Sequence, residues 1–315
     1  MRTVLLGSPP FATPVFARLV GSRHRPLALV TPPDRPRGRG RAVERSPLVE
    51  LAEREGIEVL QPADPHAPQV LARLRALRPD VLFVASYGVI LKPSLIGLAP
   101  MGTLNAHASL LPRHRGAAPI QAALLAGDEV TGVTIQRIVE ELDAGDVLLR
   151  RERPIGPREN AGELFEALAE LAGQAALEAL DLLESGQAHF EPQDHKRVTI
   201  ARKLKKAHGR IDWSKGAWEL ERFVRAMTPW PGARCSDPRG REVTVIAARI
   251  YDEGEAPGAV AGELVEVSGR LVVACGRGLL ELCQVAPAGK RPMSGAEFLR
   301  GARLEPGSRF ATPEF

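Results

Sequence analysis

Cysteine is scarce in this sequence, and long uninterrupted apolar runs are missing. The three cysteines, Cys235, Cys275 and Cys283, are too scattered for a disulfide framework and stand at no zinc-ligand spacing, so we expect them to be buried as small apolar residues. No stretch approaches the roughly 18 apolar residues of a membrane span, and the short apolar run Thr3–Gly7 does not resemble a signal peptide. We therefore expect a cytoplasmic protein without a metal ion or membrane contact.

Lysine is rare beside arginine throughout the chain, which suggests a coding bias, so single arginines carry little information. The distribution of charge is more informative than the net charge of +4. Residues 1–200 hold 23 basic and 24 acidic side chains, whereas residues 201–315 hold 19 and 14. A basic C-terminal third is typical of proteins that bind a polyanion.

Short apolar runs alternate with amphipathic segments over the first 185 or so residues. This pattern favours a parallel sheet with helices on both faces. The segments concerned are three strands, Thr3–Gly7, Leu27–Thr31 and Asp80–Ala85, and two helices, Phe11–Val20 and Ser46–Glu55, the second with Ser46 as N-cap.

A glycine fingerprint for dinucleotides is absent from this Rossmann-like pattern. The first strand is followed by Gly7-Ser-Pro-Pro10, where two prolines remove backbone donors that could hold a pyrophosphate. No Walker-type loop occurs elsewhere. We therefore expect no nucleotide cofactor.

The rest of the chain predicts a second domain. Thr131–Val139 and Val147–Arg151 are predicted to be neighbouring strands, and a long helix over Asn160–Ser185 should end at Gly186. Four further strands are expected at 243–250, 258–267, 271–275 and 279–285, and short strands separated by glycines predict a small β-barrel. We divide the chain into a catalytic domain at 1–186, a linker at 187–210 and a barrel at 211–315.

Two polar segments carry the candidate chemistry. Asn105 and His107 are two apart in a predicted strand, so both side chains should project from one face as a carbonyl polariser and an acid–base group. The acidic turn Glu141–Asp146 could bring a carboxylate beside His107. On chemistry alone, Asp143 and Asp146 are both candidates.

Longer motifs around these segments are more specific. They comprise Asn105-Ala-His-Ala-Ser-Leu-Leu-Pro112, Arg115-Gly-Ala-Ala-Pro-Ile-Gln121, Leu142-Asp-Ala-Gly-Asp146, Gly7-Ser-Pro-Pro-Phe-Ala12, Ser86-Tyr-Gly-Val-Ile-Leu91, Ile211-Asp-Trp-Ser214 and Pro229-Trp-Pro-Gly232. Over essentially the whole chain, the sequence closely resembles the folate-dependent formyltransferases, and among them those that act on methionine-charged initiator tRNA.

The resemblance implies a Rossmann-like α/β domain followed by a C-terminal barrel of oligonucleotide-binding type. It implies 10-formyltetrahydrofolate as formyl donor and a catalytic trio of Asn105, His107 and Asp143, thereby selecting Asp143 over Asp146. Residues expected to line the folate site are Ser109, Leu110, Leu111 and Pro112, with Tyr87 and Gly88 bordering the pocket.

The densest basic loop is predicted to bind the tRNA partner. Arginine suits phosphate contacts and base-edge hydrogen bonds, and the matching loop of the family enters the acceptor end of initiator tRNA. The candidates are Arg35, Arg37, Arg39, Arg41 and Arg45, with a second cluster at Arg202, Lys203, Lys205 and Lys206. The family commonly has lysines where this chain has Arg41-Ala42. We expect the chain to act as a monomer.

Other functions remain as alternatives. Glycinamide ribonucleotide formyltransferases are shorter and lack a barrel, sugar-nucleotide formyltransferases diverge at Ala117–Gln121, and formyltetrahydrofolate hydrolases use water instead of an amine. The basic loop and the Ile211–Ser214 motif argue against all three, and the trio would be superfluous in a non-catalytic RNA-binding module. The remaining histidines are expected at the surface: His24, His66, His114, His189, His195 and His208.

Overall fold

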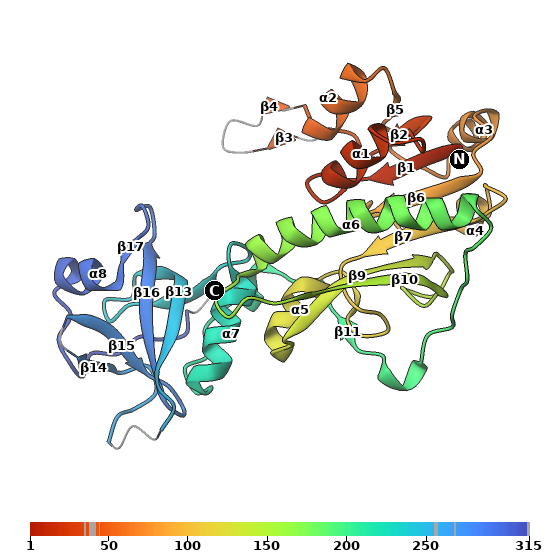
Figure 1. Ribbon diagram of the computed structural model, residues 1–315. Helices are drawn as coiled ribbons and strands as arrows, with labels where there is room; N and C mark the ends of the chain where they lie inside the picture. Colours follow the sequence, from red (N-terminus) through yellow and green to blue (C-terminus); the bar gives the residue numbers. More distant parts are fainter. Residues whose placement is uncertain (35, 38–41, 44, 255–257, 268, 314–315) are drawn as a thin grey trace. The chain divides into compact units, whose positions relative to one another are not determined.

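The computed structural model describes residues 1–34, 36–37, 42–43, 45–254, 258–267 and 269–313 (Figure 1). It divides into two compact units. The first unit comprises Met1–Pro119, Val130–Pro154 and Phe165–Ala201, and the second comprises Ile120–Glu129, Ile155–Leu164 and Arg202–Phe315. The chain thus passes into the second unit twice before entering it finally at Arg202.

A seven-stranded sheet with the order β10-β9-β7-β6-β1-β2-β5 forms the centre of the first unit. Its strands are β1 (Thr3–Gly7), β2 (Ala28–Val30), β5 (Glu58–Leu60), β6 (Val81–Ala85), β7 (Thr103–His107), β9 (Val130–Arg137) and β10 (Val147–Pro154). The five strands from β5 to β7 pair in parallel, which confirms the predicted Rossmann-like domain. β9 runs antiparallel to β7 at the edge of this sheet. β10 in turn pairs antiparallel with β9, because their connection is too short for a parallel crossover.

Helices cover both faces of this sheet, since β1 and β6 are buried at every position. The helices of the first unit are α1 (Ala12–Val20), α2 (Pro47–Arg54), α3 (Pro68–Ala76), α4 (Pro93–Ile96) and, from Phe165 on, α6 (Ala161–Glu184). Leu74 of α3 and Leu95 of α4 pack against alternate residues of β1, β2 and β6 in one cluster. On α6, Gly173 lies against α1, where an added Cβ would stand 3.2 Å from the carbonyl oxygen of Pro14.

Several predicted boundaries agree with the structure, and one strand is shorter than predicted. The long helix ends within two residues of Gly186, which takes the left-handed conformation at φ +70°. Ser46 precedes α2 as its N-cap in an extended conformation with Pro47 at the start of the helix, as predicted, although its hydroxyl makes no capping hydrogen bond. In the predicted strand 258–267, only Leu264–Val267 is a strand, β14.

Residues 187–201 belong to the first unit and contact the rest of it. Asp194 caps the short helix η1 (His195–Arg197), and β11 (Ile200–Ala201) pairs in parallel with β8 (Arg115–Gly116). A separate pair, β3 (Pro36–Arg37) with β4 (Ala42–Val43), lies in the basic loop.

The second unit is built on an antiparallel sheet. The strand order is β12-β13-β16-β15-β14, with β17 beside β16. Its elements are α5 (Pro119–Ala126), η2 (Lys206–Gly209), α7 (Ala217–Met227), β12 (Ala233–Ser236), β13 (Glu242–Asp252), β14, β15 (Arg270–Ala274), β16 (Leu279–Pro287), β17 (Met293–Ser294) and α8 (Gly295–Ala302). Register shifts along β13 bend the sheet into a half-barrel, which agrees with the predicted oligonucleotide-binding type of domain.

No helix in the described part of the chain is long and apolar enough to cross a membrane.

Candidate active site

The sheet of the first unit has a switch point between β1 and β6. β2 and β5 lie on one side of β1, whereas β7 lies on the opposite side, beyond β6. Open α/β sheets bind ligands outside the carboxyl ends of their strands at such a point. Here the segments that follow β1 and β6 are joined, because the Ser8 hydroxyl donates to the carbonyl of Tyr87 at 3.0 Å. His107 ends β7 at the same edge of the sheet.

The ring of His107 is buried and held on one side by the backbone. Its Nε2 lies 2.9 Å from the carbonyl oxygen of His114. A carbonyl oxygen can only accept, so Nε2 must carry the hydrogen. The neutral ring therefore has its lone pair on Nδ1, which lies 3.7 Å from Oδ2 of Asp143. His107 can take up a proton at Nδ1 and, once charged, forms an ion pair with Asp143.

Asp143 is fixed by two donors at once. Its Oδ2 accepts from the backbone N–H of Gly116 at 2.8 Å, and its Oδ1 accepts from Nε2 of Gln136 at 3.1 Å. The backbone of Asp143 has φ +47°, a conformation that favours glycine. Asp146, the alternative from the sequence, is exposed. Of the two carboxylates, the structure brings Asp143 to His107.

Asn105 lies two residues before His107 on β7 and therefore on the same face. It pairs with Val84 of β6 on one side and with Gln136 of β9 on the other. Its side chain is half-buried, and its amide makes no hydrogen bond within the described residues. Both amide hydrogens thus remain available to a ligand at this edge.

Hydrogen bonds fix the conformation of Ser109–Pro112, the segment expected to line the folate site. Thr134 joins its two ends, because its hydroxyl donates to the carbonyl of Ser109 at 2.7 Å and accepts from the N–H of Leu111 at 3.0 Å. Ser109 in turn donates to the carbonyl of Arg113 at 2.7 Å. Leu110 is half-buried, whereas Leu111 and Pro112 are buried.

Tyr87 and Gly88 follow β6 at the same edge. The side chain of Tyr87 is buried in the cluster beneath α3 and α4, and burial raises its pKa to about 12. Gly88 has φ +79°, and a Cβ built there would meet no atom within 4 Å. The space beside Gly88 is therefore open.

The predicted tRNA contacts fall in two groups. Arg35, Arg39 and Arg41 lie outside the described residues, and Arg37 ends β3. Arg45 is exposed and forms an ion pair with Glu53. The second group begins where the chain enters the second unit, and all four of its side chains are exposed: Arg202, Lys203, Lys205 and Lys206.

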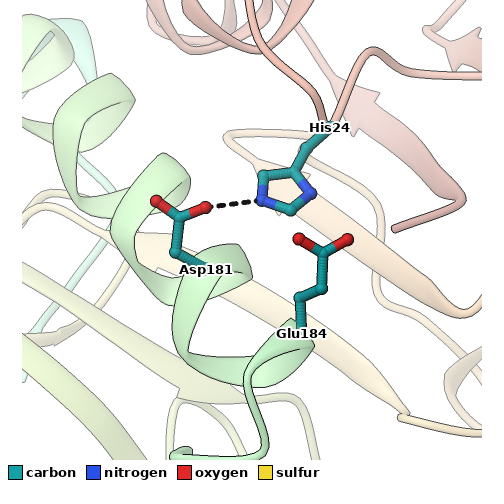
Figure 2. Close-up of side chains that lie close together, drawn as sticks. All are labelled: His24, Asp181 and Glu184. Carbon is teal, nitrogen blue, oxygen red and sulfur yellow. Dashed lines mark hydrogen bonds and ion pairs between the residues drawn. The ribbon is translucent and has the colours of Figure 1, made fainter.

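One cluster among the described residues has the geometry of three metal ligands. The ligand atoms of His24, Asp181 and Glu184 lie within 4.8 Å of one another (Figure 2). However, Nε2 of His24 already bonds Asp181 at 2.8 Å, and Arg23 pairs with Asp181 at 2.6 Å and with Glu184 at 3.0 Å. The hydrogen bond from His24, helped by Arg23, lowers the pKa of Asp181. These pairs already occupy the three side chains. They link α6 to the loop after α1.

Sequence reasoning missed residues that surround the trio. Arg115, Gln136 and Gln193 form a hydrogen-bonded chain beside Asp143, and no periodicity signals residues so far apart in sequence. The prediction that His24 and His114 lie at the surface is wrong, because both are buried. The flanking residues of these histidines are polar, but contacts from distant segments cover them.

Two family models together match most of the chain. The family model described as Formyl transferase matches residues 1–180, and that described as Formyl transferase, C-terminal domain, matches residues 203–303. The methionyl-tRNA formyltransferase of Methylococcus capsulatus is 43% identical over 99% of this chain and 100% of its own length. That of a Methylobacterium species is 42% identical over 99% of both chains.

Solved structures share the fold at lower identity. HypX from Aquifex aeolicus in complex with tetrahydrofolic acid matches 96% of this chain with a TM-score of 0.61 and 22% identity, and this chain spans 48% of HypX. An N-formyltransferase from Helicobacter canadensis, in complex with folinic acid and a dTDP-sugar, matches 90% of this chain and 98% of its own with a TM-score of 0.64 and 14% identity. At these identities the likeness concerns the fold.

Proposed function

Because this chain belongs to the methionyl-tRNA formyltransferase family, we propose that its Asn105, His107 and Asp143 carry out the formyl transfer. The chain transfers the formyl group of 10-formyltetrahydrofolate to the α-amino group of methionine on initiator tRNA, for translation initiation. The observation that supports the trio best is the environment of His107, whose Nε2 is tied to a carbonyl while its Nδ1 lies 3.7 Å from Asp143.

Asn105 acts on the formyl oxygen. The folate cosubstrate supplies a formyl group that is already activated for attack at carbon. As the methionine amine attacks, negative charge develops on the formyl oxygen, and the free amide of Asn105 donates a hydrogen bond to it. One such donor typically lowers the barrier by about 3 kcal/mol.

His107 and Asp143 move the proton. The attacking amine must lose a proton, which the Nδ1 lone pair of neutral His107 accepts. Asp143 stabilises the resulting imidazolium across 3.7 Å, and Nδ1–H can also donate to the formyl oxygen. The same proton then passes to N10 of the folate as the bond between N10 and the formyl carbon breaks. This step returns His107 to its neutral form.

The folate itself is proposed to lie along Ser109, Leu110, Leu111 and Pro112, beside the backbone of Tyr87 and Gly88. The missing side chain at Gly88 leaves open space, and the half-buried Leu110 offers apolar surface, which fits a flat pteridine ring. The internal hydrogen bonds of Thr134 keep this segment in shape before the folate binds.

For the tRNA, we propose the arginines of the 35–45 loop and the cluster Arg202, Lys203, Lys205 and Lys206 as phosphate contacts. Their support is the density of exposed positive charge in the second cluster and the need to hold a polyanion. We further propose that the chain acts as a monomer in the cytoplasm, where charged initiator tRNA enters translation.

The trio is tested by single-turnover formyl transfer with the Asn105→Asp and His107→Ala variants. Each variant should transfer formyl at least about 100-fold more slowly than the wild-type protein, because a donor or the proton carrier is lost. Binding of methionyl-tRNA, measured separately, should stay nearly unchanged. Near-normal transfer in both variants would rule out these roles.

A further inference from the structure

Gln193 lies in the segment between α6 and β11 and is 4% exposed. Its Oε1 accepts from two nitrogens of Arg115, Nε at 3.1 Å and Nη2 at 2.9 Å. A guanidinium can only donate, so this pair fixes which end of the Gln193 amide is the oxygen. Its Nε2 must therefore point the other way.

On that other side, Nε2 of Gln193 meets the turn that carries Asp143. It donates to the carbonyl of Gly145 at 2.7 Å and to the carbonyl of Asp143 itself at 2.9 Å. Asp143 is held at φ +47°, a strained conformation that a residue other than glycine keeps only where neighbouring contacts enforce it. The Gln193 amide supplies two such contacts directly on the backbone of this turn.

The same nitrogen also contacts Gln136, so its two hydrogens are shared among three acceptors. Nε2 of Gln193 lies 3.1 Å from Oε1 of Gln136, so the oxygen of that amide faces Gln193 and its Nε2 faces Oδ1 of Asp143 at 3.1 Å. Arg115, Gln193, Gln136 and Asp143 thus form a chain of hydrogen bonds with a single direction. Each donor in this chain sets the orientation of the next amide.

The segment of Gln193 reaches His107 as well. Thr199 accepts from the N–H of His114 at 2.8 Å, and the carbonyl of His114 accepts from Nε2 of His107. Next to it, β11 pairs with β8, whose Gly116 donates to the second oxygen of Asp143. Residues 193–201 therefore support both partners of the proposed His107–Asp143 pair.

From these contacts we infer that Gln193 is a positioning residue for formyl transfer, acting through the backbone of the Asp143 turn and through Gln136. This inference rests on the proposed roles of the catalytic trio. It predicts that the polarity of the Gln193 amide affects the rate of the chemical step more than substrate binding.

The test uses Gln193→Glu, which has the same shape. The variant keeps an oxygen for Arg115 but sets a second oxygen against the carbonyls of Asp143 and Gly145. A misplacement of the carboxylate by about 1 Å predicts a loss of kcat on the order of 10- to 100-fold, whereas KM for both substrates should change by no more than about threefold. Unchanged kcat would overturn the inference.

A matched control separates positioning from stability. Thr228→Val removes a buried hydroxyl that donates to the carbonyl of Val224 in the second unit, outside the network. It should lower the melting temperature without the selective loss of kcat. If Gln193→Glu and Thr228→Val lowered kcat equally, the effect of Gln193 would be one of stability alone.

A double-mutant cycle gives the decisive readout. If Gln193 acts through Asp143, adding Gln193→Glu to Asp143→Ala should cause little further loss of rate. Independent, multiplying losses would overturn the inference. Normal activity of Asp143→Ala alone would instead refute the proposed trio. Should Gln193→Glu fail to fold, Gln136→Met, which removes the donor to Oδ1 of Asp143, enters the same cycle with the same expected outcomes.

Discussion

Asp143 and Asp146 stand three residues apart in one acidic turn, yet their surroundings differ. Asp143 receives hydrogen bonds from Gly116 and Gln136 and faces His107, whereas Asp146 is exposed. A carboxylate that must pair with a transient imidazolium needs a fixed position and partial burial. Only Asp143 of this pair meets that need.

Replacing each aspartate by asparagine should therefore separate their roles. Asp143→Asn removes the negative charge beside His107 and should lower kcat on the order of 100-fold or more. Asp146→Asn changes an exposed group and should leave kcat within about twofold of the wild-type value. Steady-state formylation of methionyl-tRNA measures both, and equal losses in the two variants would contradict the assignment.

Cys235 and Cys275 should be chemically inert in the folded protein, because both are buried, whereas the expected burial of Cys283 is wrong since it is only half-buried. Burial raises the pKa of the thiols of Cys235 and Cys275, that of Cys275 to about 12. The thiolate is the reactive form, so at pH 8 these two thiols stay protonated as well as shielded. A thiol reagent should leave Cys235 and Cys275 unmodified until the protein unfolds. Modification of either at the rate of a free thiol would contradict this picture.

The sequence predicts the arrangement of single residues where it depends only on their neighbours in the chain. The two-residue spacing of Asn105 and His107 predicts one shared strand face, and the structure has that strand. Gln193 could not be found in this way. Its role depends on contacts with Arg115 and Gln136, which are 78 and 57 residues away, and no local pattern encodes such distances.

The length and the end of helix α6 can be predicted from the sequence, but its attachment to the rest of the fold cannot. Its composition and the glycine after it predict both its length and its end, because those signals are local. Its attachment to the loop after α1 through His24 and Asp181 is a tertiary feature, which is why the sequence suggested a surface histidine there. The segment 187–201 likewise has no apolar periodicity, although β11 and Gln193 tie it to the first unit.

Asp181→Ala should loosen α6. The change leaves Nε2 of the fully buried His24 without its acceptor, which should lower the free energy of unfolding by about 1–3 kcal/mol at pH 7. Because the His24 hydrogen bond lowers the pKa of Asp181, this stabilisation exists above the ordinary carboxyl pKa and is lost as the pH falls through the folded value. The difference between variant and wild type should thus shrink in acid.

Urea unfolding at pH 7 and in acid measures this difference. Glu170→Ala provides the control, since it removes an exposed acidic residue of the same helix. Equal unfolding midpoints for the wild-type protein and Asp181→Ala at pH 7 would show that the link does not stabilise α6.

Across the whole molecule, the charge distribution of the sequence agrees with the division into two units. The excess of basic over acidic residues lies at 201–315, and the second unit is entered finally at Arg202. The fold class followed from alternating apolar runs and from family resemblance. The antiparallel pairing of β9 with β7 and the return of 120–129 and 155–164 to the second unit follow instead from contacts between distant segments.

The basic cluster should govern the salt dependence of tRNA binding. Replacing Arg202, Lys203, Lys205 and Lys206 by glutamine should weaken binding and reduce the slope of log K against log salt by up to about 3, if each side chain neutralises a phosphate. The control Lys290→Gln with Arg291→Gln removes two exposed cations from another part of the second unit. A slope that is unchanged in the four-residue variant would place the phosphate contacts elsewhere.

The central claim is that this chain formylates methionine on initiator tRNA with 10-formyltetrahydrofolate as donor. Labelled formyl transfer should be followed to methionine-charged initiator tRNA and, in parallel, to methionine-charged elongator tRNA. We expect rapid labelling of the initiator and little labelling of the elongator. Absence of labelling on both, with active folate and folded protein, would contradict the account.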